Sequence, residues 1–219
     1  MVERIIIEGE TVEEVWLNAP AQDVLFRQQA CSTLRLHILH LSGKPASINV
    51  LDHIRVEQEG TGCLTEIYAL NCLAGEDEAV LHTDVRHTVG GGRSRQVVKY
   101  VLTGRSKGAF RGDVLIAQDA RQTDVEQRNR NILLSDTATM RTQPQLEIYA
   151  DDVKASHGAS TGKLDESALF YMRQRCLSEQ EGRRLLLKAF LEDITEGITD
   201  EEKRRQSVDA IDSVIEQLQ

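Results

Sequence analysis

The sequence has few aromatic residues, few prolines and no excess of positive charge. Aromatic side chains make up 4% of its 219 residues, three prolines are present, and 35 acidic against 26 basic side chains give a net charge of −9. The low aromatic content argues against a platform that stacks nucleic-acid bases. The acidic balance argues against binding to nucleic acid or to an anionic membrane, because both need a positive surface.

The chain also lacks paired cysteines and long apolar runs. Cys31, Cys63, Cys72 and Cys176 do not have the spacing of a zinc site, a ferredoxin site or a disulfide framework. The apolar runs are shorter than the roughly 20 residues of a membrane helix. The opening residues, MVERIIIEGE, carry early glutamates and are not typical of a signal peptide. We therefore expect a soluble, cytoplasmic protein with reduced thiols.

What the chain does contain, up to about residue 162, is short runs in which apolar and polar residues alternate. Leu34, Leu36 and Ile38 alternate with Arg35 and His37. Such alternation is the pattern of β-strands. Most of the runs recur at intervals of roughly a dozen to eighteen residues without intervening helices, which indicates a β-sandwich, a barrel or a β-solenoid. No strict sequence repeat singles out the solenoid.

After residue 162 the pattern predicts three helices. Each opens on a capping residue or a capping box: Asp165, then Ser178 with Glu181, then Thr199 with Glu202. The third helix carries one apolar stripe, formed by Val208, Ile211, Ile215 and Leu218. We expect this stripe to pack on the second helix, with a partner subunit as the alternative. The chain is thus divided into a β body, residues 1–161, and a helical domain, residues 162–219.

Two groups of residues are candidates for metal chemistry. His82, Asp84 and His87 offer imidazole and carboxylate ligands, which suit zinc or ferrous iron. On a strand His82 and Asp84 would share a face, and His87 would join them only through a bulge or a turn. A polar loop is the commoner explanation of such a group. The second candidate is His157, beside Gly158 at the junction between strands and helices.

Several ordered blocks resemble the SufB/SufD family of iron–sulfur cluster assembly proteins. Residues 117–136, AQDARQTDVEQRNRNILLSD, resemble its AQxTDAxQxNKNLLLSD stretch. Residues 144–159 resemble its PxLEIxADDVKCSHGAT signature, and residues 164–173 are similar to its LDEEALFYLRSRGI continuation. Upstream, residues 82–91 and 100–112 look like its histidine-containing segment and its YKGVL…FNG stretch. The SHGA form at residues 156–159 points to the SufD side of the family.

This resemblance implies a mainly β protein, a right-handed parallel β-helix followed by a small α-helical domain. It implies a non-catalytic scaffold subunit that pairs with SufB across the C-terminal ends of two β-helices and docks the SufC ATPase on its helices. A nascent cluster at the SufB interface would be transient, so we expect no stably bound cofactor. The candidates for the SufC-facing side or its support are Phe170, Tyr171, Arg173, Leu186 and Phe190.

The cluster-ligand candidate under the same resemblance is His157, the histidine of the SHG motif. The family cysteine of KCSHG is Ala155 here, so this position supplies no thiolate, the ligand that iron favours. Family members have a helical N-terminal domain and a longer solenoid. The chain therefore resembles an N-terminally truncated member whose open first rung would self-associate, as a homodimer. Two alternatives stay open: a metal-dependent β-solenoid enzyme using His82, Asp84 and His87, and a purely structural dimerisation module.

Overall fold

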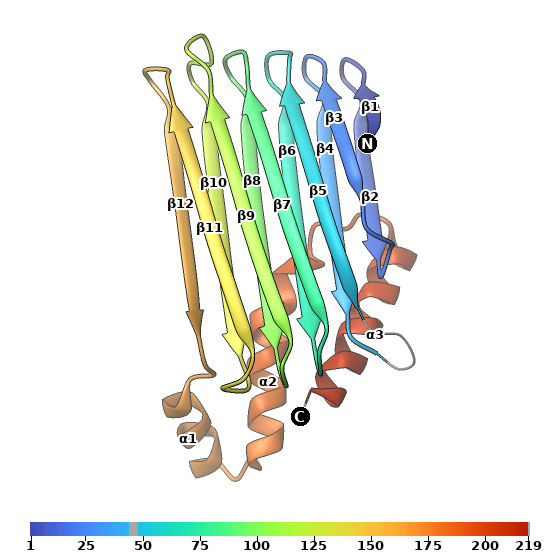
Figure 1. The fold of residues 1–219 in the computed structure, drawn as a ribbon, viewed down its shortest axis with the longest axis vertical. Coiled ribbons are helices and arrows are strands. Elements are labelled where there is room, and N and C mark those ends of the chain that lie inside the picture. Colours follow the sequence, from blue (N-terminus) through green and yellow to red (C-terminus); the bar gives the residue numbers. More distant parts are fainter. Residues whose placement is uncertain (44–47, 219) are drawn as a thin grey trace.

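The computed structural model describes residues 1–43 and 48–218. Within them the chain passes back and forth between two six-stranded sheets, and three α-helices follow (Figure 1). The odd-numbered strands form one sheet, which we call sheet A, and the even-numbered strands form sheet B. Neighbouring strands in each sheet are parallel, and together they make a β-solenoid of about five turns. The predicted fold class is confirmed.

The elements have the following bounds. Sheet A contains β1 (Val2–Ile6), β3 (Asp23–Gln28), β5 (Asn49–Gln58), β7 (Glu78–His87), β9 (Lys107–Ile116) and β11 (Thr139–Ile148). Sheet B contains β2 (Thr11–Leu17), β4 (Thr33–Leu41), β6 (Leu64–Leu73), β8 (Arg93–Leu102), β10 (Asp124–Leu133) and β12 (Lys154–Gly162). The helices are α1 (Glu166–Gln174), α2 (Glu179–Leu191), the 3-10 turn η1 (Glu192–Ile194) and α3 (Glu201–Gln217).

Inward-facing side chains from both sheets fill the solenoid. In β5, Ile54 and Val56 are fully buried, whereas Arg55 between them faces outward. Because the strands are in register, Val56, Val85 and Val114 form one buried column through three turns. Burying a side chain of this size stabilises the fold by roughly 1.5–3 kcal/mol. The alternation seen in the sequence therefore reports the inner and outer faces correctly.

The length of a turn is not constant. The register of sheet B advances 29 residues from Leu64 to Arg93, and 31 from Arg93 to Asp124. Each turn contains one strand of each sheet, so the strands follow one another at about half that distance. Unequal turns explain why the sequence shows recurrent strands without a strict repeat.

Helices α2 and α3 lie against the outer face of sheet B, and α1 lies beyond the ends of its strands (Figure 1). Leu70 and Val101 of that sheet pack against Leu187 and Ile215 in a second apolar core, separate from the solenoid interior. The covered strands are consequently buried on both faces, as in the run Val97–Leu102, and lose the simple alternation of buried and exposed residues. Ile211, Ile215 and Leu218 of the predicted stripe are buried in this core, whereas Val208 is half-buried outside it. Helix α3 contacts both α2 and β4. The predicted packing on α2 is therefore found, with sheet B as a further contact.

Two of the three predicted helix caps are present. Asp165 accepts hydrogen bonds from the first turn of α1, and Ser178 forms a capping box with the third residue of α2. The box predicted from Thr199 is wrong, because Asp200 is the residue that caps α3. The hydroxyl and N–H groups of Thr199 instead donate to the carboxylate of Glu13 on β2.

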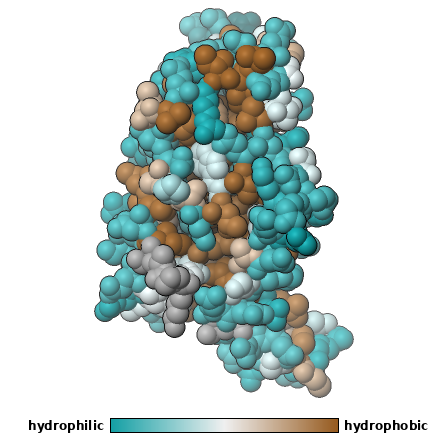
Figure 2. Space-filling view, turned by 90° about the vertical axis from the view of Figure 1, so that its right-hand side faces the viewer, coloured by the Kyte–Doolittle hydropathy of each residue, from teal (hydrophilic) through white to brown (hydrophobic). Residues whose placement is uncertain are grey.

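The solenoid has two open ends in the described part of the chain. Strands β1 and β2 form one end, and β11 and β12 form the other. Figure 2 looks onto the β1–β2 end, where apolar surface lies among hydrophilic residues. Val2, Ile5 and Ile7 are exposed in this part of the chain. Among the described residues, none of the helices combines the length and the apolar character that a membrane crossing requires.

Candidate functional site

Strand β12 places His157 on the free edge of sheet B. β12 pairs with β10 on one side, and the described residues contribute no strand on its other side. The N–H of Lys154 donates to the carbonyl of Thr123, which precedes β10 (2.9 Å). Since alternate residues of a parallel strand hydrogen-bond to opposite sides, the N–H groups of Ala155, His157 and Ala159 point to the open edge.

The side chain of His157 faces the solenoid interior. Ala155, two residues earlier, packs against the interior core, and side chains two apart on a strand share a face. His157 lies in register with Gln127 of β10, and both line a groove of about 400 Å³. Because this is the last turn, the interior is open here and His157 is exposed.

This site offers one imidazole and no thiol. Ala155 occupies the inward position nearest to His157 on the N-terminal side, and only its methyl group reaches the interior. Across residues 1–43 and 48–218, no three His, Cys, Asp or Glu side chains are close enough to hold one metal ion. A structural metal site needs about four ligands. A metal at His157 would therefore take its other ligands from a second molecule.

The structure does not bring His82, Asp84 and His87 together. Strand β7 runs without a bulge in register with both of its neighbours, so His82 and Asp84 face outward and His87 faces inward. Arg86 Nη2 donates a hydrogen bond to the carboxylate of Asp84 (2.9 Å). His87 is fully buried, with its Nε2 2.9 Å from the hydroxyl oxygen of Ser94, and burial lowers its pKa to about 4.

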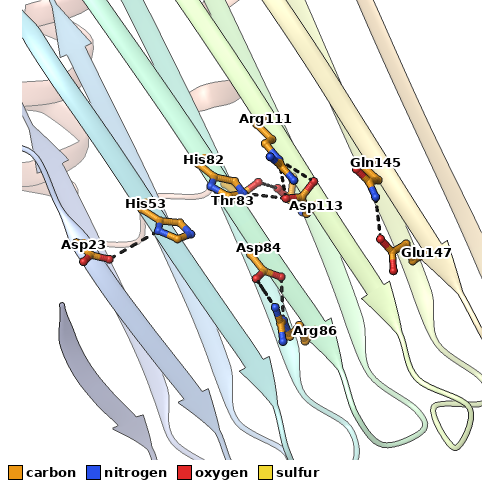
Figure 3. A network of polar contacts seen from close by, with 11 residues as sticks. Asp23, His53, His82, Thr83, Asp84, Arg86, Arg111, Asp113, Gln145 and Glu147 are labelled. Carbon is orange, nitrogen blue, oxygen red and sulfur yellow. Dashed lines mark hydrogen bonds and ion pairs between the residues drawn. The ribbon is translucent and has the colours of Figure 1, made fainter.

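His82 belongs instead to a polar ladder on the outer face of sheet A (Figure 3). Its ring stacks on that of His53 with centroids 4.4 Å apart, and its Nε2 lies 2.8 Å from a carboxylate oxygen of Asp113. Burial, with the nearby His82 and Arg55, lowers the pKa of His53. The carboxylates of Asp23 and Asp113 are each engaged by basic partners, which is the arrangement of a structural ladder. Sequence reasoning missed it because the partners lie one turn of the solenoid apart.

The five candidate residues for SufC contact fall into two settings. Phe170 and Tyr171 of α1 are 63% and 59% exposed, and Arg173 is exposed beside them. Leu186 and Phe190 of α2 are partly buried against the core between the helices and sheet B. The residues of α1 thus present a surface, and those of α2 hold the helix in place.

Two buried polar side chains of sheet B attach the end of α2 and η1. The Nζ of Lys99 donates to the carbonyl of Phe190 and to the carboxylate of Asp193, and lies 4.8 Å from the Phe190 ring. His37 Nδ1 donates to the carbonyl of Ile194 (3.0 Å). Burial lowers the pKa of both Lys99 and His37. No local sequence pattern indicates these contacts, since the partners are between 91 and 157 residues apart.

The structure is thus a parallel β-solenoid that carries a helical module on one sheet and one exposed imidazole on its last strand. A model of the family "SUF system FeS cluster assembly, SufBD core domain" matches residues 21–190. The chain belongs to this family.

Curated relatives agree with the family. The iron–sulfur cluster assembly protein SufD of Escherichia coli is 39% identical over 124 residues, which cover 57% of this chain and 29% of SufD. The SufBD family protein slr0076 of Synechocystis is 32% identical over 85% of this chain and 44% of its own length. The chloroplastic protein ABCI7 of Arabidopsis thaliana is 33% identical over 89% of this chain and 40% of its own length. The chain spans less than half the length of each of these relatives.

Proposed function

We propose that this chain is a non-catalytic scaffold subunit of the SUF system, which pairs with SufB along β12 and docks the SufC ATPase on its helices in the cytoplasm. The observation that carries the proposal is the place of His157, an exposed imidazole on a strand edge that no other described strand pairs with. Such a strand can accept another strand from a partner. The partner would then bring its own ligands next to His157.

The absence of a thiol at residue 155 limits what the chain does with a cluster. One imidazole cannot hold an iron–sulfur cluster, since such clusters are held mainly by cysteine thiolates. The cluster is therefore a transient cargo, held chiefly by SufB and touched by His157 from the side of this chain. The isolated chain carries no stably bound cofactor.

The surface for SufC is the exposed side of α1. Phe170 and Tyr171 are large, adjacent and mostly exposed, and exposed apolar patches mark sites of protein interaction. Arg173 adds a charge that an acidic partner residue can bind. Aromatic residues and arginine are also the types that most often dominate binding energy at interfaces.

Coexpression with SufB and SufC tests the proposal. A tagged chain is expected to purify with both proteins as a ternary complex. The double variant Phe170→Asp/Tyr171→Asp should lose SufC and keep SufB, because it changes only the exposed side of α1. His157→Ala should keep both partners and reduce the amount of cluster formed on the complex under anaerobic conditions. Failure to recover any ternary complex would refute the scaffold role, and recovery of a homodimer alone would favour the dimerisation module.

A further inference from the structure

We propose that Gln127 is a positioning residue for His157: its side-chain oxygen accepts a hydrogen bond from one imidazole N–H and leaves the other ring nitrogen free to bind metal. The inference rests on the proposed function of His157. It concerns a residue of β10 whose side chain faces the interior next to the candidate site.

Three polar side chains occupy one inward-facing column of sheet B. Gln96, Gln127 and His157 hold equivalent register positions in β8, β10 and β12. Gln96 and Gln127 are 0% and 1% exposed. At the inner end of the column, the hydroxyl of Thr83 on sheet A donates to Gln96 Oε1 (2.7 Å). The column thus runs from a satisfied hydrogen bond in the interior to the exposed imidazole.

The amide of Gln127 has unused hydrogen-bonding capacity. Both its Nε2 and its Oε1 are buried without a partner among the described residues, as is Nε2 of Gln96. Buried polar groups are nearly always hydrogen-bonded in folded proteins. Stacked glutamine side chains on neighbouring parallel strands, roughly 4.8 Å apart, can form a ladder of amide hydrogen bonds.

One orientation of that ladder suits a metal-binding histidine. Gln127 Nε2 donates to Gln96 Oε1, which has a second lone pair beside the one used by Thr83. Gln127 Oε1 then turns toward the last strand and accepts from His157. Metal-binding histidines almost always donate their other ring N–H to an oxygen in this way, which fixes the tautomer and the ring orientation.

The neighbouring amides cannot take this role, because they are already engaged. Asn129 and Asn131 hydrogen-bond each other, and each has a further partner, the hydroxyl of Thr142 or Thr161. Gln127 is also seated specifically, since a Cβ at Gly112 would lie 2.3 Å from its Nε2. A glycine on sheet A therefore leaves the room that this amide occupies.

Nitrogen NMR of the ring tests the inference on the chain alone. Selectively ¹⁵N-histidine-labelled protein, with the His157 signals assigned by loss in His157→Ala, reports which ring nitrogen carries the proton. We expect the ratio of the two neutral His157 tautomers to be roughly fivefold larger in the wild type than in Gln127→Leu, because one net hydrogen bond contributes about 1 kcal/mol. Gln127→Glu should restore the preference, since a carboxylate also accepts. Ser156→Ala, on the other face of β12, should leave it unchanged.

Equal tautomer ratios in wild type and Gln127→Leu would overturn the inference, as would failure of Gln127→Glu to restore the ratio. A circular dichroism spectrum and thermal midpoint for Gln127→Leu establish that the variant is folded. The proposed function has a separate readout, cluster formation on the ternary complex with His157→Ala. If Gln127→Leu shifts the tautomer ratio but His157→Ala does not change cluster formation, the positioning role stands and the proposed contact of His157 with the cluster is refuted. If His157→Ala reduces cluster formation but Gln127→Leu leaves the tautomer ratio unchanged, only the positioning role is refuted.

Discussion

His87 shows how position within a strand decides what a histidine does. It is fully buried and its pKa is about 4, whereas an unfolded histidine has a pKa near 6.5. Folding therefore favours the neutral ring. The stability that comes from this is present above about pH 6.5 and is lost as pH falls toward 4, and a shift of this size corresponds to about 3 kcal/mol.

We predict that His87→Gln flattens the pH dependence of stability between pH 7 and 4.5. Glutamine can still hydrogen-bond Ser94, but it does not bind a proton in this range. Urea unfolding at several pH values measures the effect, and comparing the variant with wild type cancels the contributions of His37 and His53, whose pKa values are also lowered. An identical pH slope in both proteins would contradict the prediction.

The contact between Lys99 and Asp193 gives an asymmetric prediction. Lys99 is buried, while the side chain of Asp193 is 50% exposed. Asp193→Ala leaves a buried cation without its anion and should cost about 3 kcal/mol. Lys99→Met removes the buried charge, keeps the volume, and returns Asp193 to water, so it should cost about 1 kcal/mol or less. Chemical unfolding of both variants is the measurement, and a loss for Asp193→Ala no larger than that for Lys99→Met would contradict the predicted asymmetry.

At the scale of elements, the start of α3 shows that a capping motif in the sequence need not form the cap in the structure. Thr199 and Glu202 fit the capping-box pattern, but the carboxylate of Glu13 binds Thr199 and leaves the cap to Asp200. We predict that Asp200→Ala lowers the free energy of unfolding by about 1 kcal/mol. Thr199→Val should cost less, because it removes one exposed hydrogen bond to Glu13. Urea titrations followed by helical circular dichroism measure the two losses in unfolding free energy. A larger loss for Thr199→Val would contradict Asp200 as the cap and favour the capping box of Thr199 and Glu202.

Local sequence patterns predict the elements of this fold, but they do not predict the contacts between distant segments. Strands and helices follow from local periodicity and caps, as Ile54, Val56 and Ser178 show. The placement of His87 inside and His82 outside also follows from parity, once β7 has no bulge. Contacts such as His37 with Ile194 join residues 157 apart in the chain. No local pattern encodes them, because the two segments meet only when the helical module docks on sheet B.

At the scale of the whole molecule, the two strands at the C-terminal end of the solenoid are protected differently. In β11, the N–H of Thr139 donates to the carbonyl of Ser106, which precedes β9. Residues of the opposite parity therefore point their N–H groups to the open edge, and at one of these positions Pro144 has no N–H. Strand β12, KASHGASTG, has no proline and its one Lys stands at its first residue. Edge strands without such features tend to pair with other strands. We therefore expect association to occur along β12.

We predict that the isolated chain forms a homodimer through β12 and that Ala159→Pro makes it a monomer. The N–H of Ala159 points to the open edge, so proline there removes an edge donor and spares the hydrogen bonds to β10. Ala159→Ser is the matched control and should remain dimeric, and Ile5→Lys adds a charge at the opposite end of the solenoid. Sedimentation velocity gives the masses. A dimer that survives Ala159→Pro but dissociates in Ile5→Lys would place the interface at β1. The homodimer and the pair with SufB would then use different surfaces of this chain.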